Sequence, residues 1–221
     1  MIPGCKTFVC RRTNYNNRHV GVTLMSGRLD CPAIFPMSVI LAVFCFTVCW
    51  SVADIADPGW VFGSNMLSDM GCSHVRVTEV TFNASCICCG LVLMAFGMSK
   101  VMFGRGVTAY SGFFLAPAGF LLSAVGVVPS DYIHWLHLSV AYGFALCAAT
   151  YILMSLSECW RTNRFVCGAF GSAFLIVCIG SFFSGSAALA ETWLVILFMI
   201  WMLLDAAMVV VSDFFGKSRH A

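Results

Sequence analysis

Six stretches of this sequence are long and apolar enough to cross a membrane as helices, and no other feature restricts the fold as strongly. A bilayer core about 30 Å thick needs roughly 20 apolar residues of helix, because lipid offers no hydrogen-bond partner to exposed backbone. The stretches run over Ala33 to Ala53, Thr78 to Ser99, Val107 to Val128, His134 to Ser157, Phe165 to Ala188 and Glu191 to Phe214. The sequence therefore predicts an all-α polytopic membrane protein with six transmembrane helices and short loops.

The composition excludes most other classes of protein. Of the 221 residues, 60% are hydrophobic and 10% are charged, whereas roughly 25% of residues are charged in soluble domains. So few charges cannot cover a soluble fold of this size, and they argue against a disordered chain or a nucleic-acid binder. The expected surroundings are the lipid bilayer of a cell membrane, and we expect a prokaryotic plasma membrane.

The basic residues predict which side of the membrane each loop faces. Cytoplasmic loops carry an excess of Lys and Arg. Eleven of the twelve basic residues lie before the first stretch, in every second loop, or in the tail, and only Arg76 falls elsewhere. Both termini are therefore predicted to be cytoplasmic. The expected organisation is a basic arm over 1–32, a six-helix domain over 33–214 and a basic tail over 215–221, with Met1 or Met25 as the start of translation.

Small residues recur at regular spacing in the third stretch. Gly112, Gly119 and Gly126 are seven residues apart, and small residues allow close contact between helices in lipid. The favoured interpretation is helix packing. The alternative is a stripe that lines a groove for a lipid or a substrate.

Polar residues gather where the predicted stretches meet the extracytoplasmic side, in four segments that can converge at one depth. Nitrogen and carboxylate groups at such a depth can bind a small solute or a metal, or supply an acid and a base. The alternative is structural, since such residues also cap helix ends. No motif identifies a cofactor, a metal or a catalytic residue. The candidate residues are Ser68, Asp69, Asn83, His134, His137 and Glu191.

One acidic residue lies well inside a predicted span. Asp205 is about 14 residues, or roughly 21 Å, into the sixth stretch. A carboxylate at such a depth is costly unless it faces the bundle or reaches water. It is interpreted either as a protonated or hydrogen-bonded structural acid or as a relay for protons or ions.

The order of the motifs resembles an uncharacterised family of multi-pass membrane proteins, "domain of unknown function 998". More distantly, the pattern is similar to the DRAM/FRAG-like membrane proteins. The resemblance covers Ala33 to Phe214 and implies the same six-helix fold, but no activity. It rests on Ser68-Asp69-Met70-Gly71 after a long loop, Phe82-Asn83 near the start of the second helix, Gly126 and Pro129 before His137, and Glu191 and Trp201 in the last helix.

Three functions are consistent with these observations. The first is a non-enzymatic membrane protein that binds a lipid headgroup, a small solute or a partner at the polar cluster. The second is a metal-dependent lipid hydrolase or transferase, which needs at least three donor side chains around one point. The third is a small transporter in which Asp205 is a coupling carboxylate.

Overall fold

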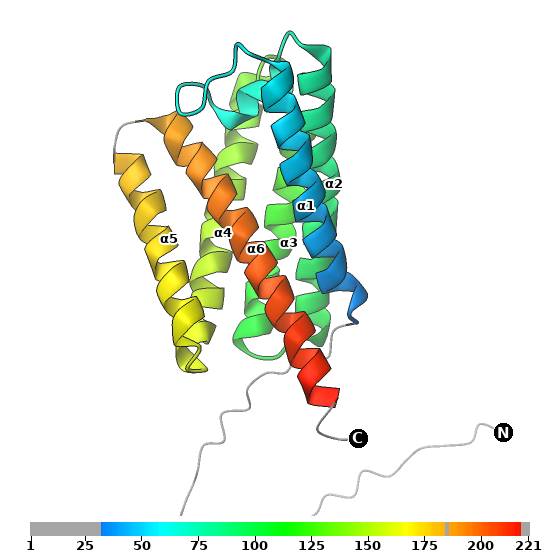
Figure 1. Cartoon of the computed structure of the whole chain (residues 1–221), viewed down its shortest axis with the longest axis vertical. Coiled ribbons are helices and arrows are strands. Elements are labelled where there is room, and N and C mark those ends of the chain that lie inside the picture. The colour runs from blue at the N-terminus through cyan, green and yellow to red at the C-terminus, as the bar shows by residue number, and fades with distance from the viewer. Residues whose placement is uncertain (1–31, 184–185, 218–221) are drawn as a thin grey trace, which may run out of the picture.

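The computed structural model of this chain describes residues 32–183 and 186–217, and within these ranges the regular elements are helices, with no β-strand (Figure 1). The predicted all-α class is confirmed. The predicted basic arm and most of the predicted tail lie outside the described residues. The elements in chain order are α1 (Ile34–Ala56), the 3-10 helix η1 (Leu67–Cys72), α2 (Arg76–Phe103), α3 (Val107–Val127), α4 (His134–Arg161), α5 (Phe165–Phe183) and α6 (Ala187–Lys217).

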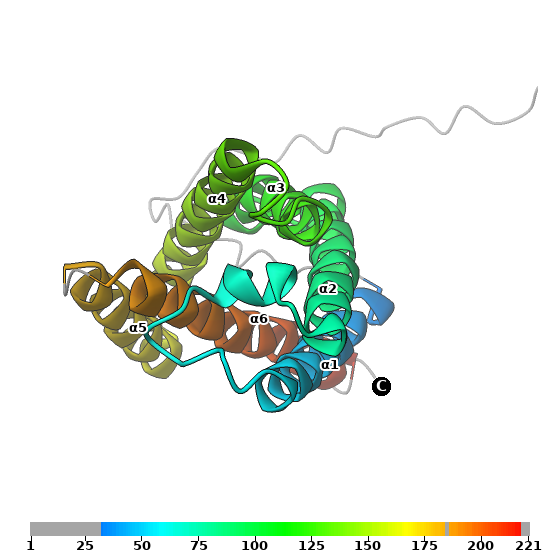
Figure 2. The same ribbon diagram turned by 90° about the horizontal axis from the view of Figure 1, so that it is seen from above.

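The α-helices form an antiparallel bundle that η1 closes at one end, which we call the η1 end. Helix α2 packs against α1 and α3, α4 packs against α3, and α6 packs against α1. Helix α5 lies on the outside, against α4 and α6. Seen from above, η1 lies over the middle of the ring of helices (Figure 2). A segment of the long first loop therefore lies directly above the interior of the bundle.

Five of these helices, α1 to α4 and α6, are long and apolar enough to cross a membrane. Helix α5 is apolar over Phe165–Ser181 but shorter. Large apolar side chains cover the outside of the bundle; Val166 and Ile176, for example, are 84% and 70% exposed. Such a surface suits lipid rather than water. The chain is a multi-pass membrane protein, and a sixth crossing by α5 stays a prediction.

The boundary between α5 and α6 differs from the predicted one. Helix α5 ends at Phe183 and α6 begins at Ala187, so the prediction of a fifth segment reaching Ala188 and a sixth beginning at Glu191 is wrong. The hydroxyl of Ser186 accepts a hydrogen bond from the backbone N–H of Leu189 at 3.2 Å, which is the contact of a helix N-cap. Glu191 therefore lies in the second turn of α6 rather than at its start.

The closest helix contact joins α2 and α3 through glycines on both sides. A Cβ on Gly119 would lie 2.3 Å from the backbone nitrogen of Met94, and one on Gly126 would lie 2.5 Å from the backbone oxygen of Asn83. From the opposite helix, a Cβ on Gly90 would lie 2.5 Å from the carbonyl oxygen of Gly119. Side chains at these positions would collide with backbone, which confirms the packing interpretation of the glycine stripe in α3.

Candidate functional site

The loop after α1 is folded back over the bundle by its own polar groups. The indole N–H of Trp60 donates to the carbonyl of Met66 at 2.8 Å. The carboxylate of Asp69 accepts a hydrogen bond from the backbone N–H of Met66 at 2.9 Å, which caps the first turn of η1. Asp69 therefore has a capping contact within its own segment, as its position before a turn allows.

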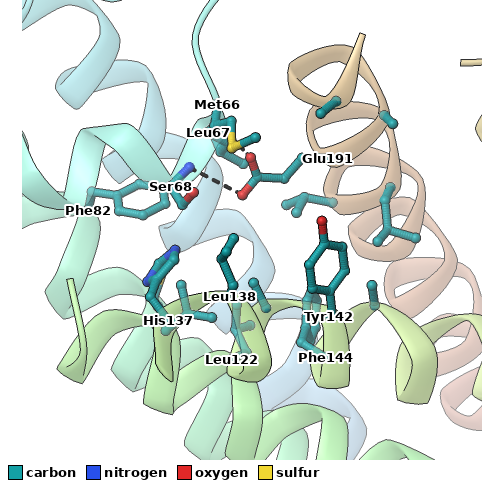
Figure 3. Close-up of a pocket in the computed structure, with 18 of the residues that line it drawn as sticks. Met66, Leu67, Ser68, Phe82, Leu122, His137, Leu138, Tyr142, Phe144 and Glu191 are labelled. Atoms are coloured by element: carbon teal, nitrogen blue, oxygen red, sulfur yellow. Dashed lines mark hydrogen bonds between the residues drawn. The ribbon is translucent and has the colours of Figure 1, made fainter. Parts of the chain in front are cut away.

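Glu191 holds η1 from across the bundle. One carboxylate oxygen accepts from the backbone N–H of Leu67 at 3.1 Å, and the other accepts from that of Ser68 at 3.3 Å (Figure 3). These N–H groups belong to the first turn of η1, where a helix has donors without internal partners. The carboxylate of α6 thus fixes the position of a segment more than 120 residues earlier in the chain.

Asn83 fixes the other end of η1 to α2. Its side-chain N–H donates to the carbonyl of Gly71 at 2.8 Å. A Cβ on Gly71 would lie 2.6 Å from the side-chain oxygen of Asn83, so a larger residue would push the two apart. That oxygen of Asn83 is buried and has no hydrogen-bond partner.

His137 is buried under η1 with one ring nitrogen unpartnered. Its Nδ1 lies 2.7 Å from the carbonyl oxygen of Val128, at the end of α3. Its Nε2 is buried and has no hydrogen-bond partner, and the side chain is only 3% exposed. By contrast, His134 is exposed at the start of α4.

A cavity of about 290 Å³ lies beneath η1, between α4 and α6. All six α-helices and the η1 segment contribute to its wall, and most of the wall is apolar. His137 and Tyr142 project from α4 toward the space below η1 and Glu191 (Figure 3). The lining residues are Phe46, Met66, Leu67, Ser68, Phe82, Cys86, Leu122, Val125, His137, Leu138, Ala141, Tyr142, Phe144, Ala145, Cys178, Ala187, Ala190, Glu191, Leu194 and Val195.

The structure brings only part of the predicted cluster to this cavity. Ser68, His137 and Glu191 line it, whereas Asp69, Asn83 and His134 do not. Within residues 32–183 and 186–217, no three His, Cys, Asp or Glu side chains are grouped closely enough to hold a metal ion. The donor grouping that the metal-dependent alternative requires is therefore missing from the described part of the chain.

A second polar cluster lies toward the opposite end of the bundle, around Asp205. The ammonium group of Lys100 lies 2.5 Å from Oδ2 of Asp205, and the hydroxyl of Tyr151 donates to the same oxygen at 2.6 Å. The side chains of Lys100 and Asp205 are 3% and 10% exposed. The ammonium group also lies 5.2 Å from the centroid of the Tyr151 ring, a distance at which a cation is attracted to an aromatic face.

The position of Lys100 differs from the one that the sequence predicts. The predicted stretch over Thr78 to Ser99 ends just before Lys100 and leaves it in a loop, but α2 continues to Phe103 and buries it. The sequence does contain a signal for the pairing of Lys100 with Asp205. A lone lysine ends one apolar segment and a lone acid lies inside another, and charges within a membrane tend to pair.

Comparison with known proteins identifies the family but no activity. A scan against protein-family models matches residues 40–208 to a family described as "Protein of unknown function (DUF998)". No match was found among curated proteins or among solved structures, and the more distant similarity to DRAM/FRAG-like proteins is not confirmed. Because the match covers most of the helical bundle, including the cavity, η1 and both polar clusters, this chain belongs to the DUF998 family of proteins of unknown function.

Proposed function

We propose that this protein binds an amphipathic small molecule of the bilayer in the cavity beneath η1. The observation that carries this proposal is the cavity itself, an apolar space with a few polar groups at one end. Such a wall is typical of ligand sites, in which apolar surface supplies affinity and a few polar groups fix orientation. The volume is close to the lower end of the range of about 300–1,000 Å³ for small-molecule pockets.

The cavity is open to the surface of the bundle on the side of α4. Tyr142 lines the cavity and is 69% exposed. Ala187, at the start of α6, also lines it and is exposed. Helix α6 packs closely against α1, whereas little of it touches α4. Because α5 lies outside and against both α4 and α6, we propose that a molecule dissolved in the surrounding lipid reaches the cavity beside the exposed Tyr142.

The positions of the polar residues support an interfacial site. We propose that all six α-helices cross the cell membrane and that the η1 end is extracytoplasmic, because the opposite end carries Arg105, Arg161 and Arg164. The polar end of the cavity then lies near the headgroups of the outer leaflet and its apolar end lies among the acyl chains. A reporter fused at the C-terminus and another inserted between α3 and α4 should be found on opposite sides of the membrane.

Asp205 supports a structural role better than a transport role. A coupling carboxylate must exchange its partner ion during each cycle, but this one is engaged by Lys100 and by Tyr151. We propose that this cluster holds α6 to α2 and α4. The cavity, rather than this acid, is then the part of the bundle that is available to a ligand.

The proposed binding is tested by filling the cavity. The full chain in lipid nanodiscs is exposed to a long-chain lipid probe that carries a photoreactive diazirine in its alkyl chain, and labelled peptides are identified by mass spectrometry. Labelling is expected on the cavity-lining faces of α4 and α6. Ala145→Phe, which adds a ring to the cavity wall, is expected to reduce that labelling at least about fivefold.

Ala95→Phe is the matched control, because Ala95 is exposed on α2 and does not line the cavity. Its labelling should equal that of the unmodified protein. The proposal is wrong if the probe labels all outward faces equally, or if the two phenylalanine variants behave alike.

A further inference from the structure

The surroundings of His137 determine which of its ring nitrogens carries the proton. Its Nδ1 faces the carbonyl oxygen of Val128 at 2.7 Å. A carbonyl oxygen can only accept a hydrogen bond, so Nδ1 must carry the hydrogen. In the neutral ring the other nitrogen, Nε2, is then an acceptor. This acceptor is the buried atom that has no partner.

The rest of the polar wall carries no cation, and its hydroxyl groups, on Ser68 and Tyr142, can donate or accept a hydrogen bond. The lining residues of the cavity include no Lys and no Arg. Glu191 is the one acidic side chain among them, and its two oxygens already accept from backbone N–H groups of η1. A phosphate or carboxylate headgroup would meet this carboxylate without a compensating charge, which is costly in an apolar site.

We propose that the cavity selects a neutral apolar molecule with a hydroxyl group, such as a long-chain alcohol or an acylglycerol, whose hydroxyl donates a hydrogen bond to Nε2 of His137. This inference rests on the proposed function and specifies the chemistry of its ligand. A hydroxyl matches a lone buried acceptor, and it is cheaper to remove from water than an ammonium group, which can also donate.

The wall below His137 suits the alkyl chain of such a molecule. His137, Ala141 and Ala145 are four residues apart and lie along one face of α4. The two alanines leave space, and Leu194 and Val195 supply apolar surface from α6. A chain whose hydroxyl lies under η1 would thus run toward the interior of the bundle, and the part that exceeds the cavity would leave beside the exposed Tyr142.

The test is a competition among four ligands that share one alkyl chain. The full chain in nanodiscs is labelled with a diazirine analogue of hexadecanol, and unlabelled hexadecanol, hexadecanoate, hexadecylamine and hexadecyl methyl ether compete at equal mole fractions in the bilayer. Hexadecanol is expected to compete at least about fivefold better than the methyl ether, which lacks the donor, and better than both charged ligands.

His137→Asn separates the hydrogen bond from the fold. The shorter amide can still donate to the carbonyl of Val128, but it no longer presents an acceptor at the position of Nε2. The advantage of hexadecanol over the methyl ether should disappear in this variant and persist in His134→Asn, the matched control on the exposed side of α4. If His137→Asn does not fold, the competition with the unmodified protein decides the proposal by itself.

The outcomes distinguish the two proposals. If no ligand protects the cavity-lining peptides from labelling, both the proposed function and the ligand assignment are wrong. If the four ligands compete equally, the cavity binds alkyl chains and the hydroxyl assignment alone fails. Stronger competition by hexadecanoate would mean that Nε2 donates, and stronger competition by hexadecylamine would mean that a cation is preferred; either result overturns the assignment.

Discussion

Two acidic residues of helix α6, Glu191 and Asp205, lie at different depths, and their surroundings differ in kind. Glu191, at the η1 end, is balanced by two backbone N–H groups of an irregular segment. Asp205, about 21 Å further along the helix, is balanced by the ammonium group of Lys100 and the hydroxyl of Tyr151. Glu191 lines a cavity. Asp205 lies among packed helices, and the residue as a whole is 7% exposed.

The difference indicates where this bundle can bind a ligand and where it cannot. Around Asp205, the ammonium group of Lys100 and the hydroxyl of Tyr151 both contact Oδ2, so the charge of this acid is balanced within the bundle. Around Glu191, the neighbouring His137 keeps a buried acceptor without a partner, and apolar space lies beside it. Buried polar groups are normally satisfied. An unused one at a cavity wall therefore points to a ligand, whereas an acid whose charge is paired inside the bundle points to a structural contact.

The comparison predicts its largest effect at Lys100. Lys100→Met leaves the carboxylate of Asp205 buried without an opposite charge, and breaking such a pair costs about 3–5 kcal/mol. We expect a large loss of stability in the free energy of unfolding measured in detergent. Replacing both partners, Lys100→Met with Asp205→Leu, should recover most of the loss, because no unpaired charge remains.

Arg105→Met is the control for Lys100→Met, since Arg105 is exposed in the connection between α2 and α3. It removes the same type of charge and should leave stability almost unchanged. If the double variant were as unstable as Lys100→Met, the contribution of this cluster would come from packing of the lysine chain and not from the ion pair.

A smaller effect, confined to the η1 end, is expected for Glu191→Gln. The amide has one acceptor oxygen where the carboxylate has two, so one N–H of η1 loses its partner at a cost of about 1–3 kcal/mol. The expected result is faster hydrogen exchange at the amides of Leu67 and Ser68, measured by mass spectrometry. The control is Glu158→Gln, because Glu158 accepts from Thr108 near the opposite end. Equal acceleration in both variants would contradict the assignment.

Tyr151→Phe should have a smaller effect on the deep cluster than Lys100→Met. It removes the hydroxyl that donates to Asp205 but leaves the contact of that acid with Lys100, and a hydrogen bond to a charged group contributes about 1.5–3 kcal/mol at most. Tyr142→Phe, on the same helix but 69% exposed, is the control and should leave the unfolding free energy unchanged. An equal loss in the two variants would mean that the hydroxyl of Tyr151 contributes nothing specific.

The apolar segments were predictable from sequence because their length depends on the thickness of the bilayer and on little else. Three members of the predicted polar cluster line one cavity, because segments at one end of an antiparallel bundle lie close together. They are Ser68, His137 and Glu191. The pairing of Lys100 with Asp205 was not predicted. A lysine that follows an apolar segment looks like a loop residue, and only the packing of α2 against its neighbours shows that the helix continues past it.

The directions of individual side chains could not be predicted either. Asp69 and His134 lie at the right depth but do not face the cavity: one caps its own turn and the other is exposed. The direction of each side chain depends on the exact turn of the backbone. Residue spacing alone does not determine that turn in a 3-10 helix or at the start of a helix.

The smallest predicted effect concerns acid sensitivity of the loop that carries η1. The hydroxyl of Ser73 donates to the carboxylate of Asp57 at 2.5 Å, and this bond, together with the backbone N–H of Gly59, lowers the pKa of Asp57. Because the folded state favours the ionised form, the contribution to stability is complete above the ordinary carboxyl pKa of about 4 and is lost as the pH falls through the lowered value. The thermal unfolding midpoint of the full chain in detergent should therefore fall more between about pH 7 and pH 3 than that of Asp57→Asn. Identical pH profiles for Asp57→Asn and the unmodified protein would show that this hydrogen bond does not stabilise the loop.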